Sequence, residues 1–264
     1  MGGSTGLMCG HPLDTVKVLQ QAGGRSSMVH VMRQIMLTDG VRGYFKGMLY
    51  PVLTAGAINS TFFWVYGKCM AGLSERNHLV NVYMAGVAGG TVQLAIACPV
   101  ELIKIRLQTQ SGAAVRYRGP HHCLQLTLAQ HGLRGLMTGL LPHWWRDGHG
   151  FGVYVVLYEA LLLLRGGREE ATTIQQFWAG GLAGMLCWLS VLPFDVVKSR
   201  MQADCPDRRQ YRNMTDCFRQ SYKADGLPVF FRGAVAMSAR AFPVNGVTFV
   251  VYETLLEYCN KRNR

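Results

Sequence analysis

Long apolar stretches alternate with short polar segments along the whole chain. Six apolar stretches cover about residues 1–21, 47–73, 79–109, 140–164, 173–203 and 234–258. A transmembrane helix needs about 20 predominantly apolar residues, and every stretch except the first reaches that length. The hydrophobic pattern therefore predicts an all-α membrane protein with six transmembrane helices. We expect the first of these helices to be shortened by one or two turns at its outer end.

Two kinds of polar segment connect the apolar stretches. The segments 74–78 and 165–170 are short and charged. The segments after the first, third and fifth stretches are longer, and each holds a short helical pattern: at about 28–38, from Pro120 onward, and at about 213–224. A proline suits the first turn of a helix, and short amphipathic helices lie parallel to a membrane surface. We expect three such helices.

A six-residue pattern occurs three times, near the ends of the first, third and fifth stretches. It consists of a proline, an acid two residues later and a lysine three residues after the acid, and a glutamine follows nine residues after each proline. The three copies are Pro12, Asp14, Lys17 and Gln21; Pro99, Glu101, Lys104 and Gln108; and Pro193, Asp195, Lys198 and Gln202. Recurrence at a nearly fixed spacing indicates a repeat architecture. The chain divides into repeats 1–73, 74–166 and 167–264.

A second pattern follows each copy of the first. It reads Phe45-Lys46-Gly47 in the first repeat and Phe231-Arg232-Gly233 in the third, and the middle repeat keeps the glycine as Met137-Thr138-Gly139. Together the two patterns resemble, in order and over nearly the whole chain, the signature of the mitochondrial carrier family. The resemblance implies a monomer with six transmembrane helices in three repeats around a threefold pseudo-axis, and with the short amphipathic helices on the matrix side.

The resemblance also implies a location and a mode of action. Members of the family are multi-pass solute carriers of the mitochondrial inner membrane that work by alternating access. Enzymatic catalysis is not expected, because the sequence shows no pairing of a nucleophile with a base and no metal-binding set. The eight cysteines form no CxxC pair, which argues against a zinc site or a disulfide framework. We expect no cofactor.

In the family, the first pattern closes the matrix side. A proline inside a helix removes a hydrogen bond and kinks the helix, so Pro12, Pro99 and Pro193 should bring three helix ends together. The resemblance then pairs charges between neighbouring helices, as Asp14 with Lys104, Glu101 with Lys198, and Asp195 with Lys17. The three glutamines would brace these pairs: Gln21, Gln108 and Gln202. Desolvation offsets much of the attraction in a buried ion pair, which suits a gate that must open.

The charge balance favours lipid as the partner of the basic residues. The chain carries 27 Lys and Arg against 15 Asp and Glu, a net charge of +12. These bases lie at helix ends and in connecting segments among apolar runs, so we expect anionic lipid and not nucleic acid as the partner. In the family, cardiolipin phosphates bind at helix starts. The matching positions in this chain are Lys46, Gly47, Arg118, Gly119, Arg232 and Gly233.

The candidate substrate residues lie seven positions after the glycines of the second pattern. They are Thr54, Arg146 and Arg240, at positions where the family meets its solutes near mid-membrane. An ionisable residue at that depth is a functional candidate, and the arginine fork matches a carboxylate or phosphate. Asp147 adds the opposite charge beside Arg146. The alternative is that Arg146 and Asp147 only neutralise one another.

The residues around Arg146 and Asp147 indicate one branch of the family. Arg146-Asp147-Gly148-His149 resembles the group related to the carnitine and basic amino acid carriers, so we expect a zwitterionic or cationic, amino-acid- or carnitine-like solute. Trp144 and Trp145 would form an aromatic wall for a cation or face lipid. Two other functions stay open. One is a carrier of a nucleotide-type cofactor such as NAD, with Arg146 and Arg240 on the pyrophosphate, and the other is a proton-leak uncoupler.

Overall fold

The computed structural model of the chain describes residues 2–23, 27–73, 78–110, 116–164, 173–204 and 209–239. Every regular element in these ranges is a helix, and no strand occurs there. The expectation of an all-α protein is therefore confirmed for the described part of the chain. The elements are α1 (Gly2–Ala22), α2 (Met28–Gly43), α3 (Leu49–Gly72), α4 (His78–Thr109), α5 (Pro120–Leu136), α6 (Leu140–His143), the π-helical segment η3 (Trp144–His149), α7 (Gly150–Leu163), α8 (Thr173–Ala203), α9 (Met214–Asp225) and the 3-10 turn η4 (Leu227–Phe231).

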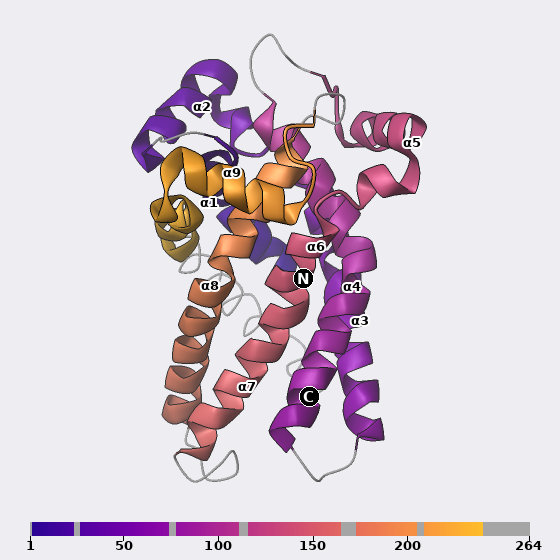
Figure 1. Ribbon diagram of the computed structural model, residues 1–264, viewed down its shortest axis with the longest axis vertical. Coiled ribbons are helices and arrows are strands. Elements are labelled where there is room, and N and C mark those ends of the chain that lie inside the picture. Colours follow the sequence, from indigo (N-terminus) through magenta and orange to yellow (C-terminus); the bar gives the residue numbers. More distant parts are fainter. Residues whose placement is uncertain are drawn as a thin grey trace, which may run out of the picture.

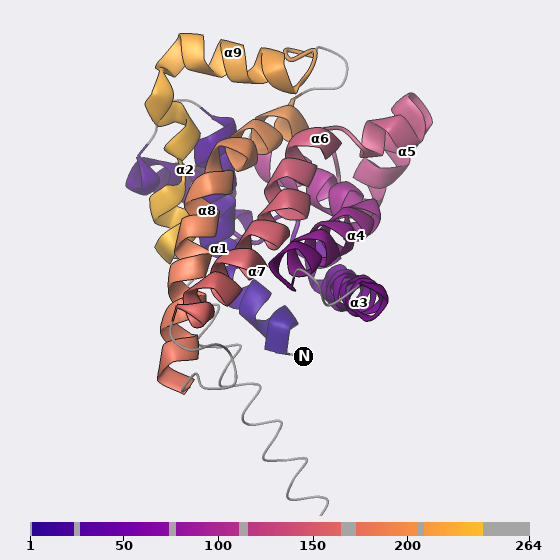
Figure 2. The same cartoon turned by 60° about the horizontal axis from the view of Figure 1, so that its bottom comes forward.

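The long helices run beside one another along the longest axis of the molecule. Figure 1 shows α3, α4, α7 and α8 in this arrangement, and α3 packs on α4, α4 on α7 and α7 on α8. Segments α6, η3 and α7 follow each other without a break, so 140–163 form one continuous helix. The short helices α2, α5 and α9 lie together at one end of the bundle, and Figure 2 shows them on different sides of it.

The long helices lie close to the positions that the hydrophobic pattern predicted. The stretches expected at about 79–109 and 173–203 are α4 and α8, and the short helix expected at about 213–224 is α9. By length and composition, two helices of the described ranges can cross a membrane, His78–Thr109 and Gly181–Ala203. A last helix is described over 234–239. Most of the expected sixth span, about 234–258, lies outside the described residues.

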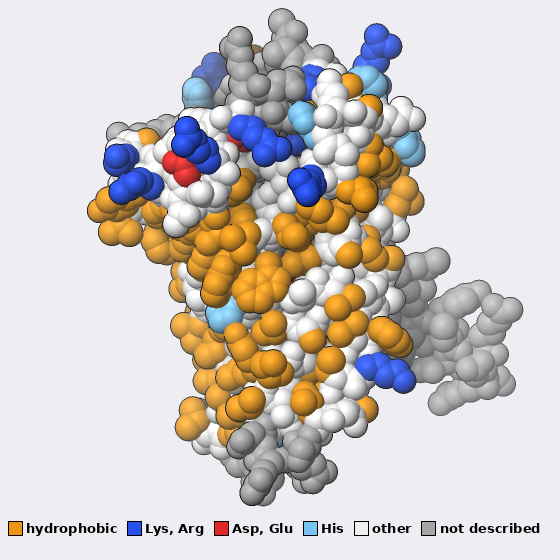
Figure 3. All heavy atoms as spheres, turned by 45° about the vertical axis from the view of Figure 1, so that its right-hand side comes forward, with side chains coloured by type: hydrophobic (Ala, Val, Ile, Leu, Met, Phe, Trp, Pro, Cys, Tyr) orange, Lys and Arg blue, Asp and Glu red, His pale blue; other side chains and the backbone are white. Residues whose placement is uncertain are grey.

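The side of the bundle is apolar and its end is basic. On the face shown in Figure 3, hydrophobic side chains cover the long helices, whereas most of the visible Lys and Arg side chains gather at the end that carries the short helices. Large apolar residues point outward from the long helices, among them Leu53, Phe63 and Trp64 on α3 and Met185 and Leu189 on α8. A surface of this kind needs an apolar solvent, as a bilayer provides.

Glycines of the second sequence pattern join each repeat to the next. Gly47, Gly139 and Gly233 have φ angles of 75°, 77° and 81°, where other residues are strained. They also leave no room for a side chain. A Cβ atom would approach the Lys104 carbonyl oxygen at 2.9 Å, the Gln202 Cγ at 2.9 Å and the Lys17 Cγ at 3.1 Å, respectively. Each glycine therefore seats its repeat against the charged segment of a neighbouring repeat.

Candidate functional site: a closed ring of ion pairs below a charged cavity

Three ion pairs connect α1, α4 and α8 near the end that carries the short helices. Lys17 Nζ lies 2.7 Å from Asp195 Oδ2, and the other two pairs are Lys104 with Asp14 and Lys198 with Glu101. Each joins two different helices, so together they form a ring. These are the pairings that the family resemblance implied, and the prolines Pro12, Pro99 and Pro193 lie inside the three helices. The side chains of Asp195 and Lys198 are each only 1% exposed.

The three glutamines differ in their contacts. Gln21 donates a hydrogen bond from Nε2 to Asp195 Oδ2 at 2.7 Å, and its Oε1 accepts one from the Ser199 hydroxyl at 2.8 Å. Gln108 donates instead to the Thr15 hydroxyl at 2.9 Å, and Gln202 has a longer contact of 3.4 Å to the Thr138 carbonyl oxygen. In this structure, Gln21 therefore braces an ion pair directly, whereas Gln108 and Gln202 bind side chains and backbone beside the ring.

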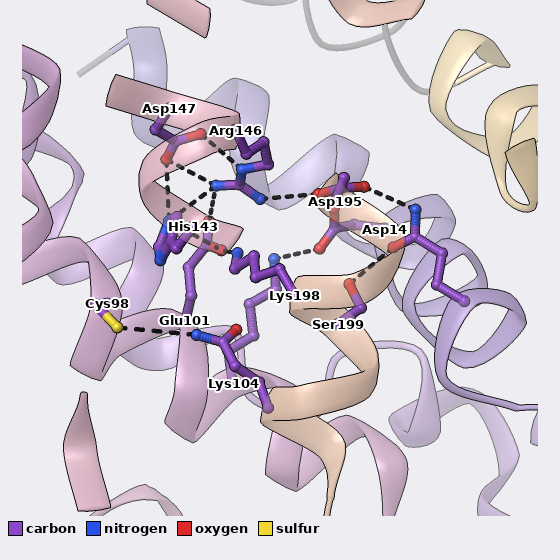
Figure 4. A network of polar contacts seen from close by, with 12 residues as sticks. Asp14, Cys98, Glu101, Lys104, His143, Arg146, Asp147, Asp195, Lys198 and Ser199 are labelled. Carbon is purple, nitrogen blue, oxygen red and sulfur yellow. Dashed lines mark hydrogen bonds and ion pairs between the residues drawn. The ribbon is translucent and has the colours of Figure 1, made fainter. Parts of the chain in front are cut away.

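Arg146 connects the candidate substrate site to this ring. Its Nε and Nη2 donate to the two carboxylate oxygens of Asp147, at 2.6 and 2.8 Å. The same guanidinium reaches Asp195 Oδ1 at 3.1 Å and Glu101 Oε1 at 3.0 Å, as Figure 4 shows. The neutralisation of Arg146 by Asp147, which the sequence left open, is thus only part of its role. The cluster holds four carboxylates and four bases.

The helix around Arg146 is wound as a π-helix. Segment η3 packs closely against α4. A Cβ atom added to Gly90 would be only 2.8 Å from the Gly148 Cα and 2.9 Å from the Asp147 carbonyl oxygen. A Cβ atom added to Gly86 would likewise be 3.1 Å from the Gly152 Cα. Small residues at this spacing allow two membrane helices to pack backbone to backbone. Single π-turns inside α-helices are frequent at functional sites.

His143 belongs to the site although its position was not predicted. Its side chain is 0% exposed, and its Nε2 lies 3.0 Å from Asp147 Oδ2, 3.1 Å from Arg146 Nη2 and 3.7 Å from Glu101 Oε2. It precedes Asp147 by four residues, and side chains at that spacing lie on the same face of a helix. That spacing is the signal that could have identified it. Glu101 contacts both the ring, through its ion pair with Lys198, and Arg146.

A cavity of about 410 Å³ lies directly on the ring of ion pairs. Its walls come from α1, α3, α4, η3, α7 and α8, and they include all six charged residues of the ring together with Arg146, Asp147, Phe151 and Trp188. On α3 the cavity is lined by Ala55 and not by Thr54. The Thr54 hydroxyl bonds instead to the Tyr50 carbonyl oxygen of its own helix at 2.8 Å. Arg240, the remaining candidate, lies outside the described residues.

The tryptophans before Arg146 do not face this cavity. The Trp144 indole nitrogen donates to the Thr91 hydroxyl at 2.8 Å, and the Trp145 ring stacks on Phe194 with centroids 5.5 Å apart. The aromatic residues among the cavity walls are Phe151 of α7 and Trp188 of α8. Of the two roles that the sequence left open for Trp144 and Trp145, an aromatic wall of this cavity is therefore not the one that the structure shows.

The candidate lipid-binding positions lie at the starts of helices, and two of the basic side chains there form ion pairs with acidic residues. Lys46 Nζ is 2.7 Å from Asp39 Oδ1, and Arg232 Nη1 is 2.9 Å from Asp225 Oδ2. Gly47 and Gly233 are the glycines with positive φ angles described above, and Gly119 precedes α5, whose first residue is proline. Within the described residues, no group of three His, Cys, Asp or Glu side chains could hold a metal ion.

Comparisons with known proteins match the chain from end to end. A family model described as "Mitochondrial carrier protein" matches residues 1–77, 75–166 and 169–263. Solute carrier family 25 member 45 of Mus musculus is 38% identical over 97% of this chain and 95% of its own length. The mitochondrial basic amino acids transporter of Bos taurus is 39% identical over 97% of this chain and 89% of its own length. Solute carrier family 25 member 47 of Homo sapiens is 34% identical over 97% of this chain and 95% of its own length.

Proposed function

Because the chain belongs to the mitochondrial carrier family, we propose that it carries a zwitterionic or cationic, amino-acid- or carnitine-like solute across the mitochondrial inner membrane by alternating access. Members of the family are transporters and not enzymes, and the three matches give the chain the threefold carrier fold. The name of the basic amino acids transporter, which is 39% identical, supports an amino-acid-like solute for this chain.

The observation that carries the proposal is the Arg146–Asp147 pair in the wall of the cavity. Arginine presents a planar fork that matches a carboxylate, and Asp147 places a negative charge beside it. A solute with one anionic and one cationic end would satisfy both side chains, whereas Asp147 would repel a dicarboxylate. Ionisable groups of this kind are costly inside a membrane and mark solute pathways.

The ring supports alternating access because Arg146 belongs to both parts of the site. In the arrangement described here the guanidinium binds Glu101 and Asp195 of the ring. A solute carboxylate that binds Arg146 would replace these two acids and weaken the closure. Buried ion pairs bring little net stability because desolvation offsets their attraction, so we expect a bound solute to shift the balance. The gate residues are Asp14, Lys17, Glu101, Lys104, Asp195 and Lys198.

The proposal extends to the surroundings of the carrier. We infer that the protein is a monomer in the inner membrane with its short helices α2, α5 and α9 on the matrix side. We also infer that cardiolipin phosphates bind at Lys46, Gly47, Arg118, Gly119, Arg232 and Gly233. Apolar outer surfaces on the long helices and bases at one end of the bundle support both inferences.

Uptake by purified protein in liposomes tests the substrate class. The panel contains lysine, arginine, carnitine, malate and NAD, and a pH-sensitive dye reports any proton leak. We expect uptake of the cationic and zwitterionic solutes and not of malate. Asp147→Asn should reduce that uptake by a factor of roughly 30 or more, because losing one partner of a buried charge contact costs about 2–5 kcal/mol. Asp216→Asn on α9, whose side chain does not line the cavity, is the matched control.

Three results would contradict the proposal. Uptake of NAD without uptake of any amino-acid-like solute would favour the nucleotide-type carrier, and a proton leak without solute uptake would favour the uncoupler. Normal uptake by Asp147→Asn would mean that the carboxylate serves only to balance Arg146.

A further inference from the structure

The proposed function gives no role to the buried imidazole of His143. Its Nε2 atom lies 3.0 Å from Asp147 Oδ2 and 3.7 Å from Glu101 Oε2, and Arg146 Nη2 is 3.1 Å from the same nitrogen (Figure 4). The His143 side chain is 0% exposed and is not among the walls of the cavity. A solute in the cavity would therefore act on His143 through these two acids and the arginine, and not by direct contact.

The groups that face this imidazole come from three helical segments. The titratable and charged ones are Arg146 and Asp147 of η3, Glu101 and Cys98 of α4, and Lys198 of α8, which binds Glu101. Carboxylates close to a histidine favour its protonated form, and a neighbouring cation opposes it. A proton on His143 is therefore stabilised by Asp147 and Glu101, the two acids within 4 Å of Nε2.

The charges of the cluster are balanced when His143 is neutral. Without the imidazole, the cluster holds four carboxylates and four bases. A zwitterion brings one charge of each sign and keeps this balance, whereas lysine or arginine brings one additional positive charge. An uncompensated charge in a buried cluster is costly. A proton on His143 is a positive charge that can leave, because histidine is the side chain that ordinarily titrates between pH 5 and 8.

A solute cation and a proton on His143 depend on the same carboxylate. The cationic end of a solute that binds Asp147 would compete for Oδ2, the oxygen that faces His143 Nε2. Binding of the cation therefore weakens binding of the proton, and this coupling is reciprocal. The side chain of Glu101 is 28% exposed and lines the cavity. It connects the buried imidazole to the space that a solute enters.

We propose that His143 is a proton-binding site of the carrier, and that a solute with a net charge of +1 is bound in exchange for this proton. The proton leaves Nε2 for the solvent of the cavity by way of Asp147 or Glu101. The loaded cluster then carries the same total charge as the empty one. The proposal rests on the proposed function, because it requires Asp147 to hold a cationic end. Unlike the proton leak of an uncoupler, this proton moves only when a solute binds.

Proton release on binding tests the proposal without transport. Purified protein in detergent is titrated calorimetrically with lysine at about pH 6.5, the ordinary pKa of histidine. The titration is run in buffers of different ionisation enthalpy, and the difference in heat gives the number of protons released. We expect lysine to release up to about one proton per molecule bound. Glutamine, a zwitterion of similar size without net charge, should release far fewer.

The pH dependence of uptake provides a second readout. Lysine uptake into liposomes is measured at low lysine concentration, with equal pH on both sides of the membrane. It should increase several-fold from about pH 5.5 to about pH 7.5, because a single competing proton changes apparent affinity by at most about tenfold per pH unit. Glutamine uptake should change less over the same range.

Variants of two histidines separate the proton site from folding. His143→Gln cannot bind the proton, so it should remove both the proton release and the pH dependence, whatever uptake rate remains. The matched control is His149→Gln on the same helix. The His149 Nδ1 lies 2.8 Å from the Tyr83 hydroxyl oxygen, and its side chain does not line the cavity. This control should keep both readouts.

The outcomes distinguish this proposal from the one on which it rests. Binding and uptake of lysine without proton release, or equal proton release by lysine and glutamine, would overturn the exchange and leave the proposed function intact. Failure of both amino acids to bind and to be taken up would overturn both proposals. Unchanged proton release in a cooperatively melting His143→Gln would assign the proton to another group and overturn the role of His143. If that variant does not melt cooperatively, His143→Asn takes its place.

Discussion

Replacing Arg146 with glutamine should destabilise the protein more than any single change to its exposed charges. The Arg146 side chain is 12% exposed and binds three carboxylates, those of Asp147, Glu101 and Asp195. Its removal leaves four carboxylates facing three bases in a buried cluster. Breaking a buried ion pair by deleting one partner costs about 3–5 kcal/mol. A surface pair would contribute only up to about 1 kcal/mol.

This loss is large enough to measure as a change in the melting temperature. In a chain of this size, 1 kcal/mol shifts Tm by about 2–4 °C, so Arg146→Gln should lower Tm by about 6–20 °C in detergent. Tryptophan fluorescence is a suitable probe, because Trp144 and Trp145 adjoin the arginine. Arg146→Lys keeps the charge but lacks the fork that reaches several acids, so we expect a smaller loss.

A double variant tests whether charge balance is the cause. Arg146→Gln combined with Asp147→Asn leaves three carboxylates and three bases, so it should melt at a higher temperature than Arg146→Gln alone. Coupled residues of this kind show interaction energies of about 0.5–3 kcal/mol. A Tm within 2 °C of the unmodified protein for Arg146→Gln would refute the reasoning. So would a double variant whose loss equals the sum of the two single losses.

Three further changes have defined outcomes. Lys104→Glu should impair uptake by leaving Asp14 opposite a like charge, and combining it with Asp14→Lys should partly restore uptake in liposomes; a double exchange no better than either single change would show that this pair does not act as a gate. Gly90→Ala should lower the free energy of unfolding by about 1–3 kcal/mol, because the new Cβ would be 2.8 Å from the Gly148 Cα. The control is Gly56→Ala, whose Cβ would have no neighbour within 4 Å. It should be neutral or slightly stabilising in the same melting assay. Burial raises the pKa of the Cys217 thiol on α9 to about 11, so that thiol stays protonated at pH 8. Maleimide should therefore label Cys217 far more slowly in the folded protein than in the denatured protein, and equal labelling rates by mass spectrometry would contradict this burial.

The helices and their repeats could be predicted from the sequence because they depend on local patterns. Apolar length gave the positions of α4 and α8, and the proline-acid-lysine copies gave the charged ends of α1, α4 and α8. The three ion pairs followed from the family resemblance, and the structure contains all three. These features could be predicted because the spacing of residues along a helix determines which face each residue occupies. The repeat boundaries themselves stay a prediction.

The details of the site could not be predicted, because they depend on distances between helices. Counting seven residues from a glycine gave Thr54, but Ala55 is the neighbour that faces the cavity. One residue turns a helix by about 100°, so an error of one position changes the face. The contacts of Arg146 with Glu101 and Asp195 likewise depend on how closely α4 and α8 approach η3. Nothing in the local pattern around Trp145 indicated that its ring stacks on Phe194.

The contacts that close the ring join the first repeat to the last. Gln21 binds Asp195 across 174 positions of sequence, and the Gln21 carbonyl oxygen accepts from Arg200 Nε at 3.0 Å across 179 positions. Contacts between such distant positions form slowly, because the chain entropy lost in bringing them together is not offset until they form. The ion pair of Lys17 with Asp195 can form only after α8 has been inserted. The α1–α8 contact is therefore a late step of assembly, because the helices between these two must be inserted first.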